Sequence, residues 1–316
     1  MTGDVRGEEH WARKGAVDLF LWRKVLAREL LPREGRAGGA AGGRPPIVLV
    51  HGSSTSAIPS FDLQVAGQPD YSFMDWLARR GWDVWTLDHE GYGRSTVTDG
   101  NSDVSCGADD LAAATPVIAA ATGATGLFVY GMSSGALRAG LFAQRAPDVV
   151  RRLVLDAFVW TGEGSPTLAK RREGVAEFRA SNRRPISRAS IESIFLRDLP
   201  GTTHPAVMAA CAEAQMQLGD SVPTGTYLDM TTHLPLVEPS AIAAPTLIVR
   251  GEHDGIATVD DLLAFFRRLP SGDKRFASLP GIAHVSPLGI RRHLLWNAVD
   301  EFFAAGLVED AEGGAA

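Results

Sequence analysis

The chain has 316 residues, of which 45% are hydrophobic and 22% are charged, and its formal net charge at pH 7 is −6. This length and composition are typical of one large folded α/β unit with an insertion, and they exclude a chain that is disordered overall. The negative charge argues against a nucleic-acid partner, and no run reaches the roughly 18 apolar residues that cross a membrane.

The N-terminus and the two cysteines bear on the compartment. The first residues, MTGDVRGEEHWARKG, carry acids where a signal peptide has a basic and then an apolar stretch. Cys106 and Cys211 lie far apart and show neither metal-ligand spacing nor a disulfide framework. We therefore expect a cytoplasmic protein with free thiols and no structural metal.

Strands and helices are predicted to alternate along most of the chain. A strand at 15–25 and a flexible Gly-rich connection at 33–46 come first. The elements that follow are strand 46–52, helix 71–81, strand 82–88, helix 107–123 (kinked or restarted at Pro116), strand 126–132, helix 134–147, strand 150–160, strand 245–251, helix 258–270, strand 274–279 and a closing helix at about 287–304. Such alternation implies right-handed crossovers and a mainly parallel sheet.

Residues 161–240 break this rhythm. They contain three helical patterns, at 166–182, 188–199 and 204–219, with no convincing strand between them. We interpret them as a helical cap inserted into an α/β core formed by residues 1–160 and 241–310. The cap would cover the carboxyl edge of the sheet, where open α/β folds bind ligands. Residues 311–316 are predicted to be a disordered tail.

The sequence GMSSG at 131–135 contains two serines. Gly131 and Gly135 flank Ser133 in the pattern G-x-S-x-G, between a predicted strand and a predicted helix. In this pattern the serine stands on a sharp, strained turn, and side chains at the flanking positions would collide with neighbouring elements. The alternative interpretation of Ser133 is an ordinary helix N-cap.

Five segments together resemble the α/β-hydrolase superfamily in order and spacing, from about residue 45 to 305. The resemblance implies a doubly wound, mostly parallel sheet and a catalytic Ser, Asp and His in that chain order. The segments are VLVHGSSTS (48–56), LDHEGYGRS (87–95), GMSSG (131–135), LIVRGEHD (247–254) and PGIAHVSP (280–287).

On this resemblance the catalytic residues are Ser133, Asp254 and His284. The histidine would remove the proton of the serine, and the carboxylate would orient the imidazole. Asp156, at the end of a predicted strand, is the rival acid. Glu252 lies too early for the family pattern, whereas Asp260 and Asp261 are explained as first-turn acids after an N-cap at Thr258.

The resemblance also implies an oxyanion hole. Its donors would be the backbone N–H of Ser134 and that of Ser53, with Ser54 as the alternative to Ser53. Two nearby features stay open. Glu90 either pairs with Arg94 or faces the pocket. In the loop 53–72, three apolar residues either line the pocket or pack beneath the loop, namely Phe61, Leu63 and Tyr71.

The composition of the predicted cap gives a weak indication of substrate. Residues 161–200 contain eight Lys/Arg and five Asp/Glu, a balance of +3 that fits a solvated helix face or a substrate with a carboxylate. Six large residues could form an apolar wall or the helix core: Trp160, Phe178, Phe195, Met208, Met216 and Met230.

The sequence therefore predicts a cofactor-free serine hydrolase that cleaves a carboxylic ester or lactone through an acyl-enzyme on Ser133. Its partner would be a small-molecule substrate with an apolar acyl group, with no metal, nucleic acid or membrane involved. Hydrolysis of a carbon–carbon bond next to a ketone uses the same residues and stays open. A non-catalytic ligand receptor on the same fold is the third alternative.

Overall fold

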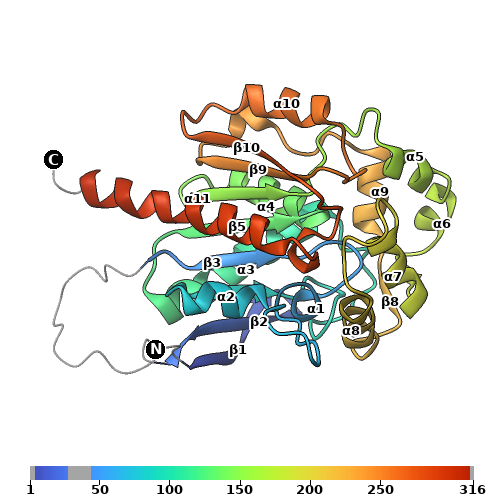
Figure 1. Cartoon of the computed structure of the whole chain (residues 1–316), viewed down its shortest axis with the longest axis horizontal. Coiled ribbons are helices and arrows are strands. Elements are labelled where there is room, and N and C mark those ends of the chain that lie inside the picture. The colour runs from blue at the N-terminus through green and yellow to red at the C-terminus, as the bar shows by residue number, and fades with distance from the viewer. Residues whose placement is uncertain (1–3, 28–43, 314–316) are drawn as a thin grey trace.

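The computed structural model describes residues 4–27 and 44–313 (Figure 1). Its eight-stranded sheet consists of β1 (Val5–Lys14), β2 (Val17–Leu26), β3 (Ile47–Val50), β4 (Val84–Leu87), β5 (Leu127–Met132), β6 (Val150–Asp156), β9 (Thr246–Gly251) and β10 (Lys274–Leu279). The strand order is β1-β2-β4-β3-β5-β6-β9-β10. The six strands from β4 to β10 in this order are parallel, whereas β1 and β2 are antiparallel at one edge. The predicted doubly wound, mostly parallel sheet is confirmed.

Helices cover both faces of the sheet. They are α2 (Phe73–Arg79), α3 (Val104–Thr122), α4 (Ser134–Arg145), α10 (Val259–Arg268) and α11 (Arg292–Gly313). Leu111, Leu137 and Phe265 bring α3, α4 and α10 into one apolar cluster. Trp76 and Trp296 bring α2 and α11 into a second cluster on the other face. The central strands are apolar along their length because both of their faces are covered.

The N-terminal edge differs from the sequence prediction. Residues 15–25 were predicted as a strand and correspond to β2, but β1 was not predicted. Its mixed sequence of charges and small residues is unlike a buried strand, because β1 lies at the sheet edge, where charged side chains are tolerated. Glu8 accepts a hydrogen bond of 2.8 Å from Arg23 on β2.

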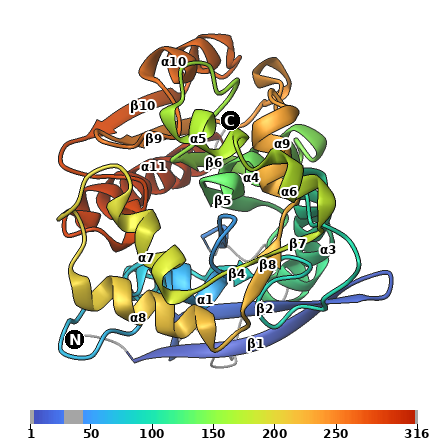
Figure 2. The same ribbon diagram turned by 90° about the vertical axis from the view of Figure 1, so that its right-hand side faces the viewer.

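The segment between β6 and β9 contains the inserted helices, α5 (Pro166–Arg172), α6 (Val175–Ala180), α7 (Arg188–Leu196), α8 (Pro205–Met216) and α9 (Gly225–Thr232). Figures 1 and 2 show them beyond the carboxyl ends of the parallel strands. We expected no strand here, and this was wrong. Two three-residue strands, β7 (Arg183–Pro185) and β8 (Ser221–Pro223), pair with each other and stay separate from the main sheet.

Several boundaries also differ from the predictions. Helix α3 runs without interruption through Pro116. Helix α11 continues to Gly313, so the predicted disorder is wrong for 311–313, whereas 314–316 and most of the Gly-rich connection lie outside the described residues.

Three short elements complete the fold: α1 (Ala57–Phe61) and the 3-10 helices η2 (Pro239–Ala241) and η3 (Ser286–Leu288). Within residues 4–27 and 44–313, no helix is both long and apolar enough to cross a membrane.

Candidate active site

Ser133 occupies a sharp turn between β5 and α4. Its backbone has φ +59° and ψ −125°, in a region that non-glycine residues rarely adopt. A Cβ atom at Gly131 would lie 2.4 Å from the carbonyl oxygen of Gly135, and one at Gly135 would lie 2.2 Å from that of Val50. Both flanking positions therefore require glycine, because the strand, turn and helix approach one another too closely for a side chain.

A chain of hydrogen bonds joins Ser133 to His284 and Asp254. His284 Nε2 lies 3.1 Å from Ser133 Oγ, and His284 Nδ1 lies 2.9 Å from Asp254 Oδ1. Burial raises the pKa of Asp254, but His284 and the backbone N–H of Ile256 more than offset this and hold the pKa below its ordinary value. The ionised carboxylate accepts the Nδ1–H of His284, which leaves Nε2 free to accept the proton of the serine hydroxyl.

Asp156, the rival acid, has different partners. It accepts hydrogen bonds from the hydroxyls of Tyr130, at 2.6 Å, and Ser286. Burial raises the pKa of Asp156 to about 7, although these bonds act in the opposite direction. Because Ser286 follows His284 by two residues, Asp156 anchors the loop that carries the imidazole. The structure places Asp254, rather than Asp156, against His284.

The loop after β3 lies against the turn at Ser133. A Cβ atom at Gly52 would lie 3.4 Å from the Cβ of Ser133. The hydroxyl of Ser53 donates to the hydroxyl of Ser134 at 2.7 Å and accepts from the hydroxyl of Thr226 at 2.9 Å. Ser134 is the first residue of α4, where backbone N–H groups have no partner within the helix. The structure thus brings Ser53 and Ser134 together beside Ser133, while Thr226 was not singled out by the sequence.

A pocket with about 580 Å³ of space between its atoms, part of it open to solvent, lies over Ser133 and His284. It lies between the carboxyl edge of the sheet and the inserted helices. Its apolar lining comes from Met132, Ile191, Ile194, Phe195, Val285 and Leu288.

The three apolar residues of the loop 53–72 lie elsewhere. Phe61 belongs to the core cluster beneath the sheet, and Leu63 and Tyr71 belong to a third cluster with α7 and α8. Their packing role is therefore the correct alternative. Of the six large residues weighed as an apolar wall, Phe195 lines the pocket over Ser133.

The inserted segment also contributes polar residues to the pocket. Arg171, Arg197 and Tyr227 line it together with Ser54. The hydroxyl of Tyr227 lies 3.4 Å from Ser54 Oγ, which also accepts a hydrogen bond of 2.8 Å from Arg184. Tyr227 was not singled out by the sequence, because no local motif marks a residue whose neighbours come from distant parts of the chain.

Glu90 neither pairs with Arg94 nor lines the pocket over Ser133. Arg94 instead forms a bidentate pair with Glu9 on β1, at 2.5 and 2.8 Å. Glu90 lies 2.9 Å from the ammonium group of Lys14, also on β1. Both alternatives left open by the sequence were wrong, because the actual partners of Glu90 and Arg94 lie on β1, which was not predicted.

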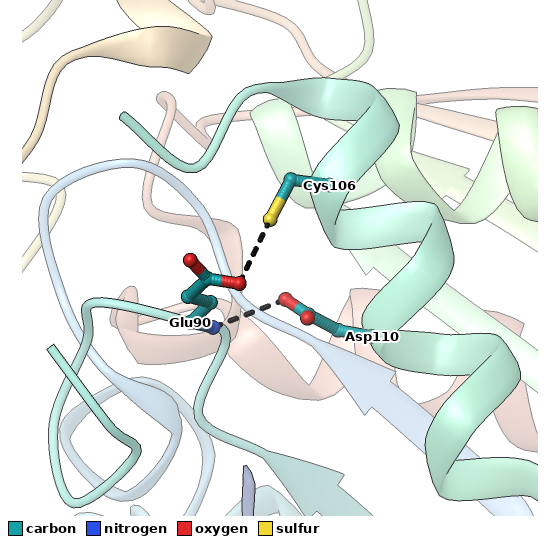
Figure 3. Close-up of side chains that lie close together, drawn as sticks. All are labelled: Glu90, Cys106 and Asp110. Carbon is teal, nitrogen blue, oxygen red and sulfur yellow. Dashed lines mark hydrogen bonds between the residues drawn. The ribbon is translucent and has the colours of Figure 1, made fainter. Parts of the chain in front are cut away.

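Lys14 completes a cluster whose other members could act as metal ligands. Figure 3 shows Glu90, Cys106 and Asp110, with the Cys106 thiol and the backbone N–H of Glu90 in hydrogen bonds. The Lys14 ammonium forms an ion pair with Asp110 and lies 3.2 Å from Cys106 Sγ. A side-chain cation is thus already placed among these three groups, and the cluster ties β1 to α3.

Comparison with known protein families decides the wider classification. Residues 66–286 match the family described as "Serine aminopeptidase, S33". The chain belongs to this family. The serine aminopeptidase S33 match covers the strand and turn around Ser133 and the inserted helices. It also covers His284, which is hydrogen-bonded to Ser133, and Asp254, which is hydrogen-bonded to His284. No curated protein matches the sequence.

Solved structures support the fold of this S33 family member. The E-2-(acetamidomethylene)succinate hydrolase is 17% identical, with a TM-score of 0.65 over 95% of this chain and 100% of its own. An esterase from Thermogutta terrifontis, solved with malate bound, is 18% identical, with a TM-score of 0.66 over 95% and 99%. The enol-lactonase from Burkholderia xenovorans LB400 is 17% identical, with a TM-score of 0.63 over 93% and 100%. The chain is a hydrolase of the α/β-hydrolase superfamily.

Proposed function

We propose that this chain is a serine hydrolase that cleaves a carboxylic ester or a lactone through an acyl-enzyme on Ser133. The observation that carries the proposal is the hydrogen-bonded series Ser133–His284–Asp254 at the floor of a pocket. An unassisted serine hydroxyl is a poor nucleophile near neutral pH, so an adjacent base is required. His284 Nε2 is within hydrogen-bonding distance of the proton it would remove.

The reaction has two halves. Ser133 Oγ attacks the ester carbonyl carbon while His284 Nε2 takes its proton, and His284 then returns that proton to the departing alkoxide. A water molecule, deprotonated by His284, hydrolyses the acyl-enzyme and restores Ser133. Asp254 keeps Nδ1 protonated and stabilises the imidazolium that forms in each half.

The negative charge on the tetrahedral intermediate needs hydrogen-bond donors. We assign this role to the backbone N–H groups of Ser134 and Ser53, which belong to two segments tied together by the bond between their hydroxyls. Each such donor contributes about 10²–10³ to the rate in other hydrolases. The positive end of the α4 dipole acts in the same direction at Ser134.

We further propose that residues 161–240 act as a cap over this site. The inserted helices supply Ile191, Ile194 and Phe195 to the pocket. This apolar lining favours a small-molecule substrate with an apolar acyl portion. The esterase and the enol-lactonase among the solved structures of this fold support an ester or lactone bond as the one cleaved.

The test is hydrolysis of p-nitrophenyl esters of increasing acyl length, and of a simple lactone, by the whole chain, together with labelling by a fluorophosphonate probe. We expect ester or lactone turnover and covalent labelling that lowers activity in proportion. Labelling without turnover of any ester or lactone would contradict the proposed substrate class and favour cleavage of another bond. An absence of both would favour a ligand receptor.

A further inference from the structure

Two arginines from separate elements lie over the ring of one tyrosine at the edge of the pocket, and a third arginine lines the same pocket. Arg171 lies on α5, Arg184 on β7 and Arg197 directly after α7, while Tyr227 lies on α9. The guanidinium carbons of Arg171 and Arg184 lie 3.9 and 4.0 Å from the centre of the Tyr227 ring. Figure 2 shows α5, α7, α9 and β7 around the carboxyl ends of the central strands.

These arginines differ from the other basic residues of the same segment. Arg172, Arg179 and Arg188 are exposed, whereas Arg171 and Arg184 are half-buried. The side chain of Arg197 is 26% exposed. Arg171 lines the pocket over Ser133, and Arg171 and Arg184 both line a neighbouring pocket that is open to solvent. A solvated helix face therefore does not account for these two arginines, whereas Arg197 is exposed as a whole residue.

The guanidinium groups of Arg171 and Arg184 have N–H donors that lack a strong acceptor. Arg171 Nη1 lies 3.6 Å from Met230 Sδ, a weak acceptor. Arg184 donates to Ser53 O and Ser54 Oγ, but its buried Nε has no partner among the described residues. Neither Arg171 nor Arg184 forms an ion pair with a carboxylate in the part of the chain that the structure describes. A half-buried guanidinium without an anionic partner is stabilised by an anion from outside.

Nearby charges leave the cluster positive. Arg197 pairs with Asp198 at 3.1 Å, which offsets one of the three cations. Burial raises the pKa of Tyr227, but the charges of Arg171 and Arg184 outweigh burial and lower the pKa to about 7. Because Arg171, Arg197 and Tyr227 line the same pocket as Ser133 and His284, a molecule bound over the nucleophile reaches this positive field.

We infer that Arg171 and Arg184, whose guanidinium groups lie over the ring of Tyr227, form an anion subsite that binds a carboxylate of the substrate, so that the ester cleaved at Ser133 is an acidic one. This inference rests on the proposed ester hydrolysis. Arg171 is the principal contact, because Arg184 is already held by the loop at Ser53 and Ser54, and Arg197 by Asp198. A guanidinium binds a carboxylate through two parallel hydrogen bonds, which also orients the substrate.

The test compares pairs of esters that differ only in whether they carry a carboxylate. Monoethyl adipate and ethyl hexanoate have the same chain, with a carboxylate in place of the terminal methyl group, and monoethyl succinate and ethyl butyrate form a shorter pair. The acid released is titrated to obtain kcat/KM for the whole chain, for Arg171→Gln and for Arg172→Gln. Arg172→Gln removes the adjacent, exposed charge and is the matched control.

We expect the wild-type chain to prefer the acidic member of at least one pair. Arg171→Gln should lower the ratio of kcat/KM, acidic ester over neutral ester, by about 10- to 100-fold, mainly through KM. Arg171→Lys should retain part of this preference, and Arg172→Gln should leave the ratio unchanged. An equal effect of Arg171→Gln on both esters, or an equal loss in Arg172→Gln, would overturn the subsite while leaving ester hydrolysis in place.

A binding measurement separates the subsite from the reaction. Adipate binding by calorimetry requires no turnover, so it tests the subsite even if every ester above is inert and the proposed hydrolysis fails. Adipate should bind to the wild-type chain and to Arg172→Gln, and about 10- to 100-fold more weakly to Arg171→Gln. Equal affinity in all three, or no binding to any of them, would contradict the inference.

Discussion

The hydroxyl of Ser53 donates a hydrogen bond of 2.7 Å to the hydroxyl of Ser134, so the loop after β3 is fastened to the first residue of α4. Ser134 therefore has a structural role for its side chain and, in our proposal, a separate catalytic role for its backbone N–H. Ser133, its neighbour, contributes its side chain to the hydrogen bond with His284. The adjacent serines can be distinguished by experiment for this reason.

The first prediction concerns these two serines. Ser133→Ala should lower kcat by about 10⁶, because it removes the nucleophile, and should abolish fluorophosphonate labelling. Ser134→Ala keeps its backbone N–H and loses the bond with Ser53, so activity should fall by about 10-fold at most. Circular dichroism should show both variants folded. Labelling that survives in Ser133→Ala but disappears in Ser134→Ala would identify Ser134 as the nucleophile.

The second prediction concerns the acid. Asp254→Asn should lower kcat/KM by about 10⁴, because an amide favours the wrong tautomer of His284. Asp156→Asn should lower it by about 10-fold at most, because an amide oxygen can still accept from Tyr130 and Ser286. Steady-state kinetics on one ester checks the order. A larger loss in Asp156→Asn would identify that residue as the partner of the histidine.

The third prediction uses the pH dependence of stability. Burial raises the pKa of Asp156 from 3.8 to about 7 in the folded chain. Between these values the folded state holds the proton of Asp156 more tightly than the unfolded state. The contribution of Asp156 to the free energy of unfolding is therefore complete below about pH 4 and is lost as the pH rises to about 7. At about 1.4 kcal/mol per pKa unit, the upper limit of this contribution to the free energy of unfolding is about 4 kcal/mol.

Asp156→Asn removes this titration. Relative to the wild-type chain, the variant should gain stability between pH 5 and pH 8, measured as the difference in Tm at each pH. Taking the difference cancels groups common to both chains, such as Asp88, whose pKa burial raises to about 6. A difference in Tm that stays constant with pH would show that Asp156 does not titrate in this range.

The fourth prediction concerns the glycines around Ser133. Gly135→Ala would place a Cβ atom 2.2 Å from the carbonyl oxygen of Val50, so the strand or the turn must move. We expect a loss of about 1–3 kcal/mol or more in the free energy of unfolding, together with slower fluorophosphonate labelling. Gly123→Ala is the matched control.

Gly123 has φ +74° at the C-terminus of α3 and open space around its missing Cβ. Its substitution should cost about 1 kcal/mol from backbone conformation alone and leave labelling unchanged. Denaturant unfolding and labelling rates check both variants. Equal costs, with equal labelling, would mean that the crowding at Gly135 relaxes without disturbing the turn.

The sequence by itself was sufficient for the parallel sheet and for the turn at Ser133. Apolar strands such as 47–50 and the glycines on either side of Ser133 are local features, and each predicts its own backbone conformation without reference to distant residues. Asp254 and His284 came from the order of family motifs. Their contact depends on two loops meeting at the edge of the sheet, which local patterns do not specify.

Only the tertiary structure decided which charges meet. Glu90 pairs with Lys14, which lies on a strand that the sequence did not predict. Arg171 and Arg184 meet at Tyr227, although a basic segment of net +3 indicated only an excess of charge. The physical reason is that backbone conformation follows from neighbours along the chain, whereas the partner, burial and pKa of an ionisable group follow from neighbours in space.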